Sequence, residues 1–346
     1  MNSQRQHRAI KVLLILLLLL PLCFVLAIAF GAVDLPVNEV LPVLLGLDSQ
    51  QSQLATIVER IRLPRALLAL LIGALLAISG AAMQGLFRNP LADPSLIGVT
   101  AGASVGAALT IVISGSVLVA AQDSWASLSL VSIGALFGGA IAVWLVYRLA
   151  TSEQGTSVAT MLLAGIAITA VAGSITSMLE FYANNEMLRR ISLWRMGGLD
   201  GANMYRVLIA AAVAAIVIGF LCAHAQALNA LLLGESEARH LGVDVDQLKQ
   251  RLVLLVAAGV GVAVALAGAI GFIGLVVPHI MRMLIGPDHR YLLVASALGG
   301  AILLLLADTL ARVVVAPTEL PVGLVTALVG APFFISLLRR RHDCGM

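Results

Sequence analysis

The sequence predicts an all-α polytopic membrane protein with about ten transmembrane helices and an inverted internal repeat. Its 346 residues are 60% hydrophobic and only 11% charged, and the mean hydropathy is +1.04. A soluble domain of this length does not need so much apolar surface. Apolar runs of about 18 residues or more, long enough to cross a bilayer, recur along the whole chain. We therefore treat residues 1–346 as a single transmembrane domain.

The apolar runs are separated by polar or glycine- and proline-containing segments, which give the order of the spans. The first run follows three basic residues and is longer than the apolar core of a typical signal peptide, so we interpret it as a retained span. The two runs that meet near residue 270 are the least clearly divided. The predicted spans cover residues 12–31, 64–84, 95–118, 126–147, 158–179, 206–224, 252–270, 271–285, 291–307 and 321–338.

An even number of spans places both ends of the chain on the same side of the membrane. Basic residues at 5, 8 and 11 and at 339–341 indicate that this side is cytoplasmic. With this orientation, 13 of the 21 lysines and arginines lie inside. The basic residues that lie outside depart from the rule that lysine and arginine gather on the cytoplasmic side, which suggests that they have binding partners. They are Arg60, Arg62, Arg65, Arg189, Arg190, Arg195, Arg206 and Arg312.

An internal repeat is visible when residues 67–98 are aligned without gaps on residues 255–286. Ten of the 32 positions are identical, and the matches include one proline position and three glycine positions. The predicted spans of the two copies run in opposite directions, as in the inverted repeats of transporters. A chance match in a chain so rich in leucine, alanine and glycine is the alternative. We place the repeat halves at about 62–180 and 250–338.

Glycine is frequent inside the predicted spans, with 32 glycines in the chain. Small residues let transmembrane helices approach closely, and the segments 134–140 (GALFGGA) and 259–274 show the pattern best. Two explanations remain open at this point, tight packing within one chain and an interface between subunits.

The sequence contains none of the motifs that would indicate an enzyme or a metal site. It has no G-x-x-x-x-G-K-[ST] phosphate loop, no H-E-x-x-H and no C-x-x-C. Few carboxylates fall inside the spans, and Glu180 and Asp308 lie at span ends, which argues against an ion-coupled transporter. We expect no catalytic residue and no metal ligand, and an energy source supplied by a partner. The alternative from a different class is an ion-coupled secondary transporter acting alone.

The longest cytoplasmic connection, residues 231–252, contains signals for two helices. Gly234 opens a short helix in which Glu235 and Arg239 are spaced for an i,i+4 ion pair, and Gly242 is placed to end it in a left-handed cap. Asp244 then begins a second helix. We expect two short helices, residues 234–249, that form a rigid lever along the membrane; an ordinary solvated hairpin is the alternative.

Together these segments resemble the permease subunits of type II ATP-binding-cassette importers for iron–siderophore complexes, haem and cobalamin. The matching stretches are RLPRALLALLIGALLAISGAAMQGLFRNPLADPSLIGVTAGA (62–103), GESEARHLGVDV (234–245), GFIGLVVPHIMRMLIGPDHR (271–290), LLLADTLAR (304–312) and ELPVGLVTALVGAPFFISLLRR (319–340). The resemblance implies a homodimer in the bacterial inner membrane, with two cytoplasmic ATPase subunits and one periplasmic binding protein. ATP and magnesium would bind to the ATPase partner, and this chain would hold no cofactor.

The resemblance also assigns roles to residues at both ends of the spans. It implies that Arg62 and Arg65 of RLPR and Arg312 of ADTLAR pair with glutamates of the binding protein, whereas Arg60 is not matched by the motif. It implies that the cytoplasmic short helices contact the ATPase. The expected contact residues are Gly234, Glu235, Ser236, Glu237, Ala238, Arg239, His240, Leu241 and Gly242.

The sequence leaves more than one candidate for the substrate. The stretch MQGLFRNPLADP is most similar to haem permeases, although siderophore permeases have close counterparts, and cobalamin remains an alternative. Haem carries two carboxylates, so Arg189, Arg190 and Arg195 are candidates to meet them; capping of an outer helix or contact with lipid headgroups is the other interpretation. The net charge of +3 reflects the bias of the loops rather than nucleic-acid binding.

Overall fold

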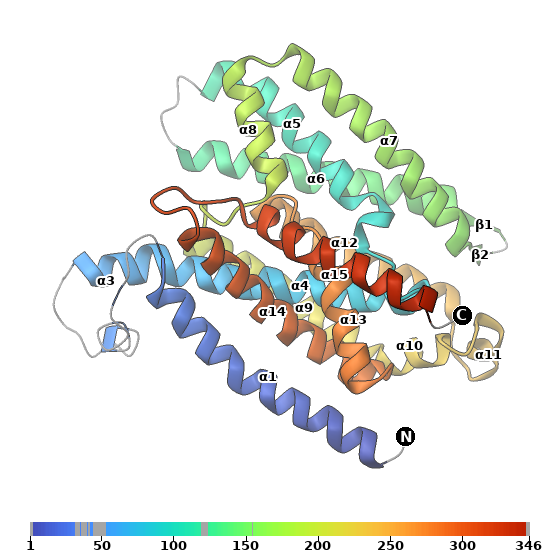
Figure 1. The fold of residues 1–346 in the computed structure, drawn as a ribbon. Coiled ribbons are helices and arrows are strands. Elements are labelled where there is room, and N and C mark those ends of the chain that lie inside the picture. The colour runs from blue at the N-terminus through green and yellow to red at the C-terminus, as the bar shows by residue number, and fades with distance from the viewer. Residues whose placement is uncertain are drawn as a thin grey trace.

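The computed structural model is built almost wholly of helices (Figure 1). It describes residues 3–31, 35, 40, 42–43, 53–118, 124–153 and 155–343, with side chains left undescribed at 3, 53, 115–118, 124–128 and 337–343. The basic side chains at 339–341, which supported the topology, are therefore outside the described part. The elements are α1 (Ser3–Ala29), α3 (Gln53–Ile57), the π-helix η1 (Val58–Arg62), α4 (Leu63–Leu86), the 3-10 helix η2 (Pro94–Ile97), α5 (Val99–Leu118), α6 (Ser124–Ala150), β1 (Thr151–Ser152), β2 (Gly155–Thr156), α7 (Val158–Tyr182), α8 (Asn185–Met196), α9 (Met204–Ala223), α10 (Ala225–Leu231), α11 (Glu235–His240), α12 (Val245–Ala267), α13 (Ile273–Ile285), α14 (His289–Val313) and α15 (Val322–Asp343).

Each predicted span falls on a helix of the structure. Within the described residues, seven helices are long and apolar enough to cross a membrane, namely α1, the continuous stretch Leu54–Leu86, α6, α7, α9, α12 and α14. The described apolar parts of α5, α13 and α15 are shorter. The uncertain pair near residue 270 is divided between α12 and α13, where Gly268 and Phe272 adopt positive φ. The fold class predicted from the sequence is confirmed.

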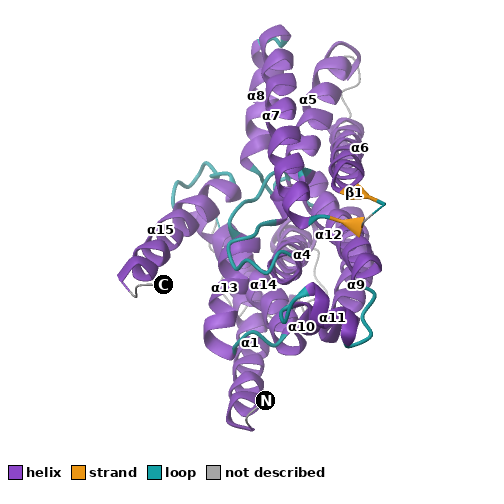
Figure 2. Cartoon of the chain, turned by 90° about the vertical axis from the view of Figure 1, so that its right-hand side faces the viewer, coloured by secondary structure: helices purple, strands orange, loops and turns teal. Residues whose placement is uncertain are grey.

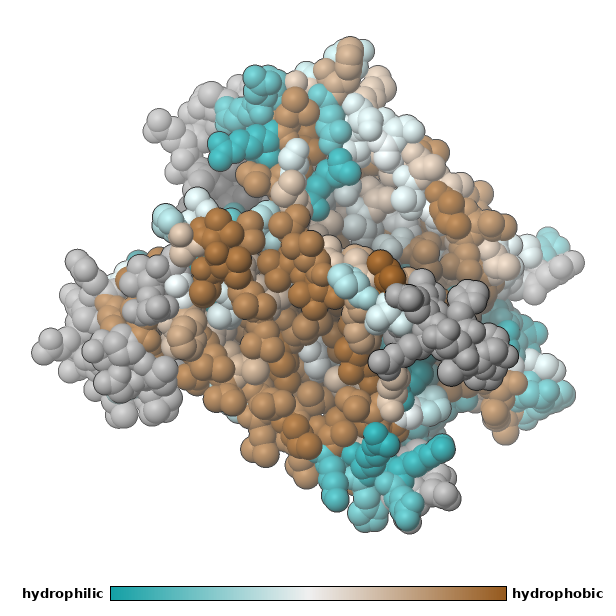
Figure 3. Space-filling model, viewed as in Figure 1, coloured by the Kyte–Doolittle hydropathy of each residue, from teal (hydrophilic) through white to brown (hydrophobic). Residues whose placement is uncertain are grey.

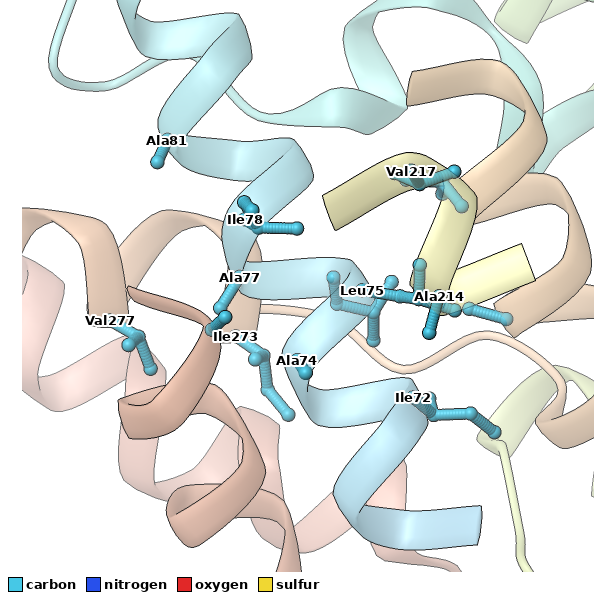
Figure 4. Close-up of a cluster of buried hydrophobic side chains, with 14 of the residues drawn as sticks. Ile72, Ala74, Leu75, Ala77, Ile78, Ala81, Ala214, Val217, Ile273 and Val277 are labelled. Carbon is cyan, nitrogen blue, oxygen red and sulfur yellow. The ribbon is translucent and has the colours of Figure 1, made fainter. Parts of the chain in front are cut away.

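Helix α4 forms the centre of the bundle. It is apolar around its whole circumference, and it packs on α14, α12, α13 and α9 (Figure 1). Its side chains meet Ala214 and Val217 of α9 on one side and Ile273 and Val277 of α13 on the other (Figure 4). A helix enclosed in this way holds the position of its first turn, which carries Arg65, relative to all its neighbours.

Glycines allow the backbone of α4 to contact the backbones of neighbouring helices directly. A Cβ at Gly73 would lie 2.3 Å from the carbonyl oxygen of Gly300 on α14, and one at Gly80 would lie 1.8 Å from that of Gly274 on α13. No larger residue fits at either position without moving a helix. The small residues therefore fix how α13 and α14 cross α4.

The glycines of GALFGGA pack inside the chain. Gly134 and Gly138 of α6 face Gly106 and Gly102 of α5, where an added Cβ would lie 2.0–2.3 Å from a facing carbonyl or hydroxyl oxygen. Packing within one chain therefore accounts for these glycines, and they need no subunit interface to explain them.

Several landmarks of the aligned repeat segments keep similar geometry, and others do not. Helices η2 and α13 both end at a glycine with positive φ, Gly98 (+78°) and Gly286 (+92°). By contrast, Gly80 lies inside α4, whereas the aligned Gly268 ends α12 with a φ of +69°. The start of α4 and the end of α12 line the same cavity, so the two helices run in opposite directions.

The two ends of the bundle carry different elements. Helix α1 begins and α15 ends at the end that also carries α10, α11 and the β1–β2 hairpin, which we call the inner end (Figures 1 and 2). The opposite, outer end carries α3, α8 and the connection from α14 to α15. Apolar residues cover the middle of the face formed by α1 and α14, and hydrophilic residues gather near the start of α1 and over α8 (Figure 3).

Candidate functional site

The arginines of the outer end form an ion-pair cluster around one buried carboxylate. Arg65, in the first turn of α4, donates through Nε to Oδ1 of Asp308 at 2.9 Å and through Nη1 to Oε2 of Glu319 at 2.6 Å. Arg312 approaches the other carboxylate oxygen of Asp308 at 3.0 Å. The side chain of Asp308 is 2% exposed, so the two guanidinium groups share a carboxylate from which water is excluded.

The same cluster closes the outer end of α1. The last carbonyl groups of a helix have no partner within the helix, and they attract positive charge. Arg62 donates to the carbonyl oxygens of Ile28 (2.6 Å) and Ala29 (2.7 Å), and Arg312 donates to that of Ala27 (2.7 Å). These bonds join α1 to α4 and α14.

The three arginines that the resemblance assigns to docking are buried in this structure. Arg62, Arg65 and Arg312 are 7%, 8% and 5% exposed, and the contacts above lie within the chain. Their guanidinium groups are desolvated, and the end of α1 and carboxylates of the same chain serve as their partners. Arg60 lies on η1 and is exposed. Docking itself stays a prediction.

A cavity of about 500 Å³ lies beside the cluster at the outer end. Its walls come from α5, α8, the turn 197–201, the end of α12 and the segment 319–321, which leads into α15. Most of the wall is apolar. The charged lining residues are Arg65, Arg190, Asp200, Arg206 and Glu319.

The charged groups of the cavity include three cations and two anions. Arg65 is paired with carboxylates, whereas Arg206 donates to the carbonyl oxygen of Leu266 at 3.1 Å and to the hydroxyl of Ser132 at 3.4 Å, and it interacts electrostatically with Asp200. Arg206 thus contributes a guanidinium group to a wall that is mostly apolar. Such a lining suits a ligand with a flat apolar body and a carboxylate at its edge.

The three arginines proposed for the substrate path all lie on α8, but only one of them lines the cavity. Arg190 does, and its guanidinium also pairs with Glu186 one turn earlier at 2.8 Å. Arg195 pairs with Glu180 at 2.9 Å, and Arg189 is exposed; neither is among the lining residues. Helix α8 itself was not predicted as an element, because it is polar and lies between two spans.

The turn after α8 is shaped by close backbone contacts. Gly197 has a φ of +70°, and the N–H of Gly198 donates to the carbonyl oxygen of Ala267 at 2.8 Å. A Cβ at Gly268 would lie 2.3 Å from the carbonyl oxygen of Trp194. The sequence analysis made no prediction for GGLDG at 197–201, and the structure shows that it forms a cavity wall.

The inner end carries the segment predicted to contact an ATPase. Gly234 (φ +125°) precedes α11 and Gly242 (φ +84°) follows it in the left-handed region. The carboxylate of Asp244 accepts a hydrogen bond from the N–H of Gln247 at 3.0 Å and so begins α12. The predicted helix signals are confirmed, but the second helix is not short, because it continues as the span α12 to Ala267.

The predicted i,i+4 ion pair within α11 is wrong. Glu235 pairs with Lys249 at 2.8 Å, and Arg239 pairs with Asp246 at 3.0 Å, so both side chains reach to α12 instead of to each other. Of the predicted contact residues, Ala238 is buried and Gly234 and Glu235 are half-buried. The exposed ones are Ser236, Glu237, Arg239, His240, Leu241 and Gly242.

Comparison with known proteins decides the family. The profile of the FecCD transport family matches residues 17–340, nearly the whole chain. The chain belongs to the FecCD transport family. The hemin transport system permease protein HmuU of Yersinia pestis is 47% identical over 287 residues, 82% of this chain and 83% of that protein. The cobalamin import system permease protein BtuC of Halobacterium salinarum is 46% identical over 286 residues, 83% of this chain and 74% of that protein.

Solved structures agree with this membership. A metal-chelate type ABC transporter in an inward-facing conformation matches with a TM-score of 0.83 and 32% identity, and the match covers 95% of this chain and 99% of that one. As a FecCD family member, the chain is a multi-span permease of a transport system, and the family resemblance read from the motifs is confirmed.

Proposed function

We propose that this FecCD permease carries haem from the periplasm to the cytoplasm as the membrane subunit of an ATP-driven importer. The observation that carries the proposal is the 47% identity to a hemin permease over most of both chains. The outer cavity supports it, since an apolar chamber edged by Arg190 and Arg206 fits an apolar ring with carboxylates. The chain supplies the path, and a partner supplies the energy.

Cobalamin is the second candidate, favoured by the 46% identity to a cobalamin permease. Cobalamin is bulkier than haem and has no pair of carboxylates at one edge. The two candidates therefore differ in how much they depend on the cationic side chains of the cavity. A ferric siderophore is a third substrate of the same kind.

The proposed assembly has two copies of this chain, two cytoplasmic ATPase subunits that bind ATP and magnesium, and one periplasmic binding protein. The inner end is cytoplasmic in this arrangement, because the start of α1 carries Arg5, Arg8 and Lys11. The exposed face of α11 then meets the ATPase. The outer end, with Arg60 exposed beside the buried arginine cluster, meets the binding protein.

The test is uptake into proteoliposomes that contain the permease with its ATPase and the substrate-loaded binding protein. Haem, a ferric siderophore and cobalamin are offered separately, each with and without ATP and magnesium. Uptake of haem that requires ATP is the expected result. ATP-dependent uptake of cobalamin alone would replace haem with the second candidate.

A matched preparation without the ATPase, but with a proton or sodium gradient, tests the ion-coupled alternative. The proposal expects no uptake there. Gradient-driven accumulation in the absence of ATP would contradict it.

A further inference from the structure

Lys249 is a buried lysine at the inner end, and the function described so far does not use it. It lies one turn into α12 and is 2% exposed. Lysine is almost never fully buried unless its charge is paired, because the ammonium group loses its hydration. Its Nζ atom lies 2.8 Å from Oε2 of Glu235 on α11 and donates to the carbonyl oxygen of Thr156 at 2.7 Å.

Thr156 belongs to the β1–β2 hairpin, which joins α6 to α7. Its carbonyl oxygen accepts from Lys249, and its N–H donates to Oδ1 of Asp246 at 3.3 Å. Both backbone polar groups of Thr156 are therefore bonded to side chains of α12. The carboxylate of Asp246 also pairs with Arg239 of α11. We call Glu235, Arg239, Asp246, Lys249 and Thr156 the Lys249 clamp.

The hairpin depends on this clamp for its position. Each of its strands has two residues, with Thr151 opposite Thr156, and so short a hairpin has little stability of its own. Gly155 has a φ of +107°, and a Cβ there would lie 2.7 Å from Oδ1 of Asp246. The hairpin is therefore pressed against the start of α12 with no space for a side chain between them.

We propose that the Lys249 clamp makes the β1–β2 hairpin part of the coupling device, so that displacement of α11 is passed to α6 and α7 as well as to α12. The inference rests on the proposed function, because it assumes that α11 receives the motion of an ATPase. Figure 2 shows α11 and the hairpin on the side of the bundle that faces the viewer, and α12 contacts both. Rigid helices then carry the displacement outward.

The outward route ends at the cavity. Helix α7 is followed by α8, which contributes Arg190 and Trp194 to the cavity lining, and α6 is locked to α5 by facing glycines. Helix α12 ends at the same cavity with residues 265–267. Two walls of the cavity are thus connected to α11, one through α12 and the other through Lys249 and the hairpin. Lys249 is a positioning residue in this scheme.

The test compares Lys249→Met with Arg251→Met in the complete transporter in proteoliposomes. Arg251 lies two residues further along α12, is exposed and bonds only to Gln247 among the contacts described, so it is a matched control. Substrate uptake and ATP hydrolysis are measured together. Lys249→Met should lower the uptake per ATP hydrolysed at least fivefold, and Lys249→Arg, which keeps the charge, should restore part of it. An unchanged ratio in Lys249→Met would overturn the proposal.

A second variant tests the clamp by a different substitution, and a second measurement tests it without relying on substrate uptake. Asp246→Asn weakens the hold on the hairpin without leaving a buried charge, and its uptake per ATP should fall in the same direction. Hydrogen exchange at residues 151–157 and 185–196 is followed with and without ATP. In the wild type both segments should change on ATP binding; in Lys249→Met the change should be lost from both and retained in α11.

Exchange changes in 185–196 that survive Lys249→Met would overturn the clamp even if no substrate were transported. Absence of uptake in the wild type, with an exchange response that depends on Lys249, would instead count against the proposed substrates alone. The two proposals therefore fail in different ways.

Discussion

Arg65 and Asp308 are 243 positions apart in the sequence, yet their charged groups lie 2.9 Å from each other at the outer end of the bundle. The pair joins the first turn of α4 to the last turns of α14. Because Arg312 contacts the same carboxylate, Asp308 faces two buried guanidinium groups, and Glu319 gives Arg65 a second, more exposed partner. Asp308 is the carboxylate that both arginines share.

Replacing Asp308 with asparagine should therefore destabilise the protein strongly. Removing one member of a buried ion pair leaves a buried charge without its counterion, and it costs about 3–5 kcal/mol. Thermal unfolding in detergent measures the effect. Glu186→Gln is the control, because that ion pair with Arg190 is exposed and contributes about 0–1 kcal/mol. Equal unfolding temperatures for the two variants would contradict the assignment.

Docking of the binding protein should distinguish Arg60 from its buried neighbours. Arg60→Glu should slow association and reduce its salt dependence while leaving the unfolding temperature unchanged, because the side chain is exposed. Arg62→Glu should lower the unfolding temperature as well, since it would place a carboxylate beside the carbonyl oxygens of Ile28 and Ala29. Surface plasmon resonance on the detergent-solubilised permease measures docking. Normal docking by Arg60→Glu would remove its role.

Helix packing around α4 predicts a contrast between two glycines. Gly80→Ala should destabilise the protein by about 1–3 kcal/mol or more, because the added Cβ would overlap the backbone of Gly274 and push α13 away. Gly173→Ala on α7 meets no atom within 4 Å, and it should be neutral or stabilising by about 0.5–1 kcal/mol. Thermal unfolding of both variants side by side is the measurement. A Gly80→Ala protein as stable as the wild type would show that the two helices are not held in contact.

The architecture follows from local signals in the sequence, whereas the partners of charged groups do not. The lengths of the apolar runs predicted the spans. Gly242 and Asp244 marked the end of α11 and the start of α12, because the chain conformation at a helix end is decided by neighbouring residues. The i,i+4 spacing of Glu235 and Arg239 was misleading, since Lys249 and Asp246 on the next helix compete for the same charges.

The arginine cluster at the outer end is another case in which the partners of charged groups could not be predicted from the sequence. Nothing near RLPR in the sequence indicates that Arg65 pairs with Asp308, because that contact exists only once α4 and α14 are packed. The outside position of the arginines suggested that they have partners, and the structure gives Arg62, Arg65 and Arg312 partners within the chain. Contact with a binding protein stays a prediction. Lys249 carried a signal that could have been used, since it is one of only two lysines and lies near a helix start that holds two carboxylates, Asp244 and Asp246.

The cavity makes a last prediction about substrate recognition, tested with two neighbouring arginines of α8. Arg190 lines the cavity and Arg189 is exposed outside it, so Arg190→Gln should raise the KM for haem uptake severalfold, while Arg189→Gln should leave it near the wild-type value. The reason is that a charge-assisted bond to a carboxylate is about twice as strong as a neutral one. Cobalamin, offered to the same variants, should be affected little, because it lacks the paired carboxylates. Equal KM values for haem in the two variants would show that Arg190 does not contact the substrate.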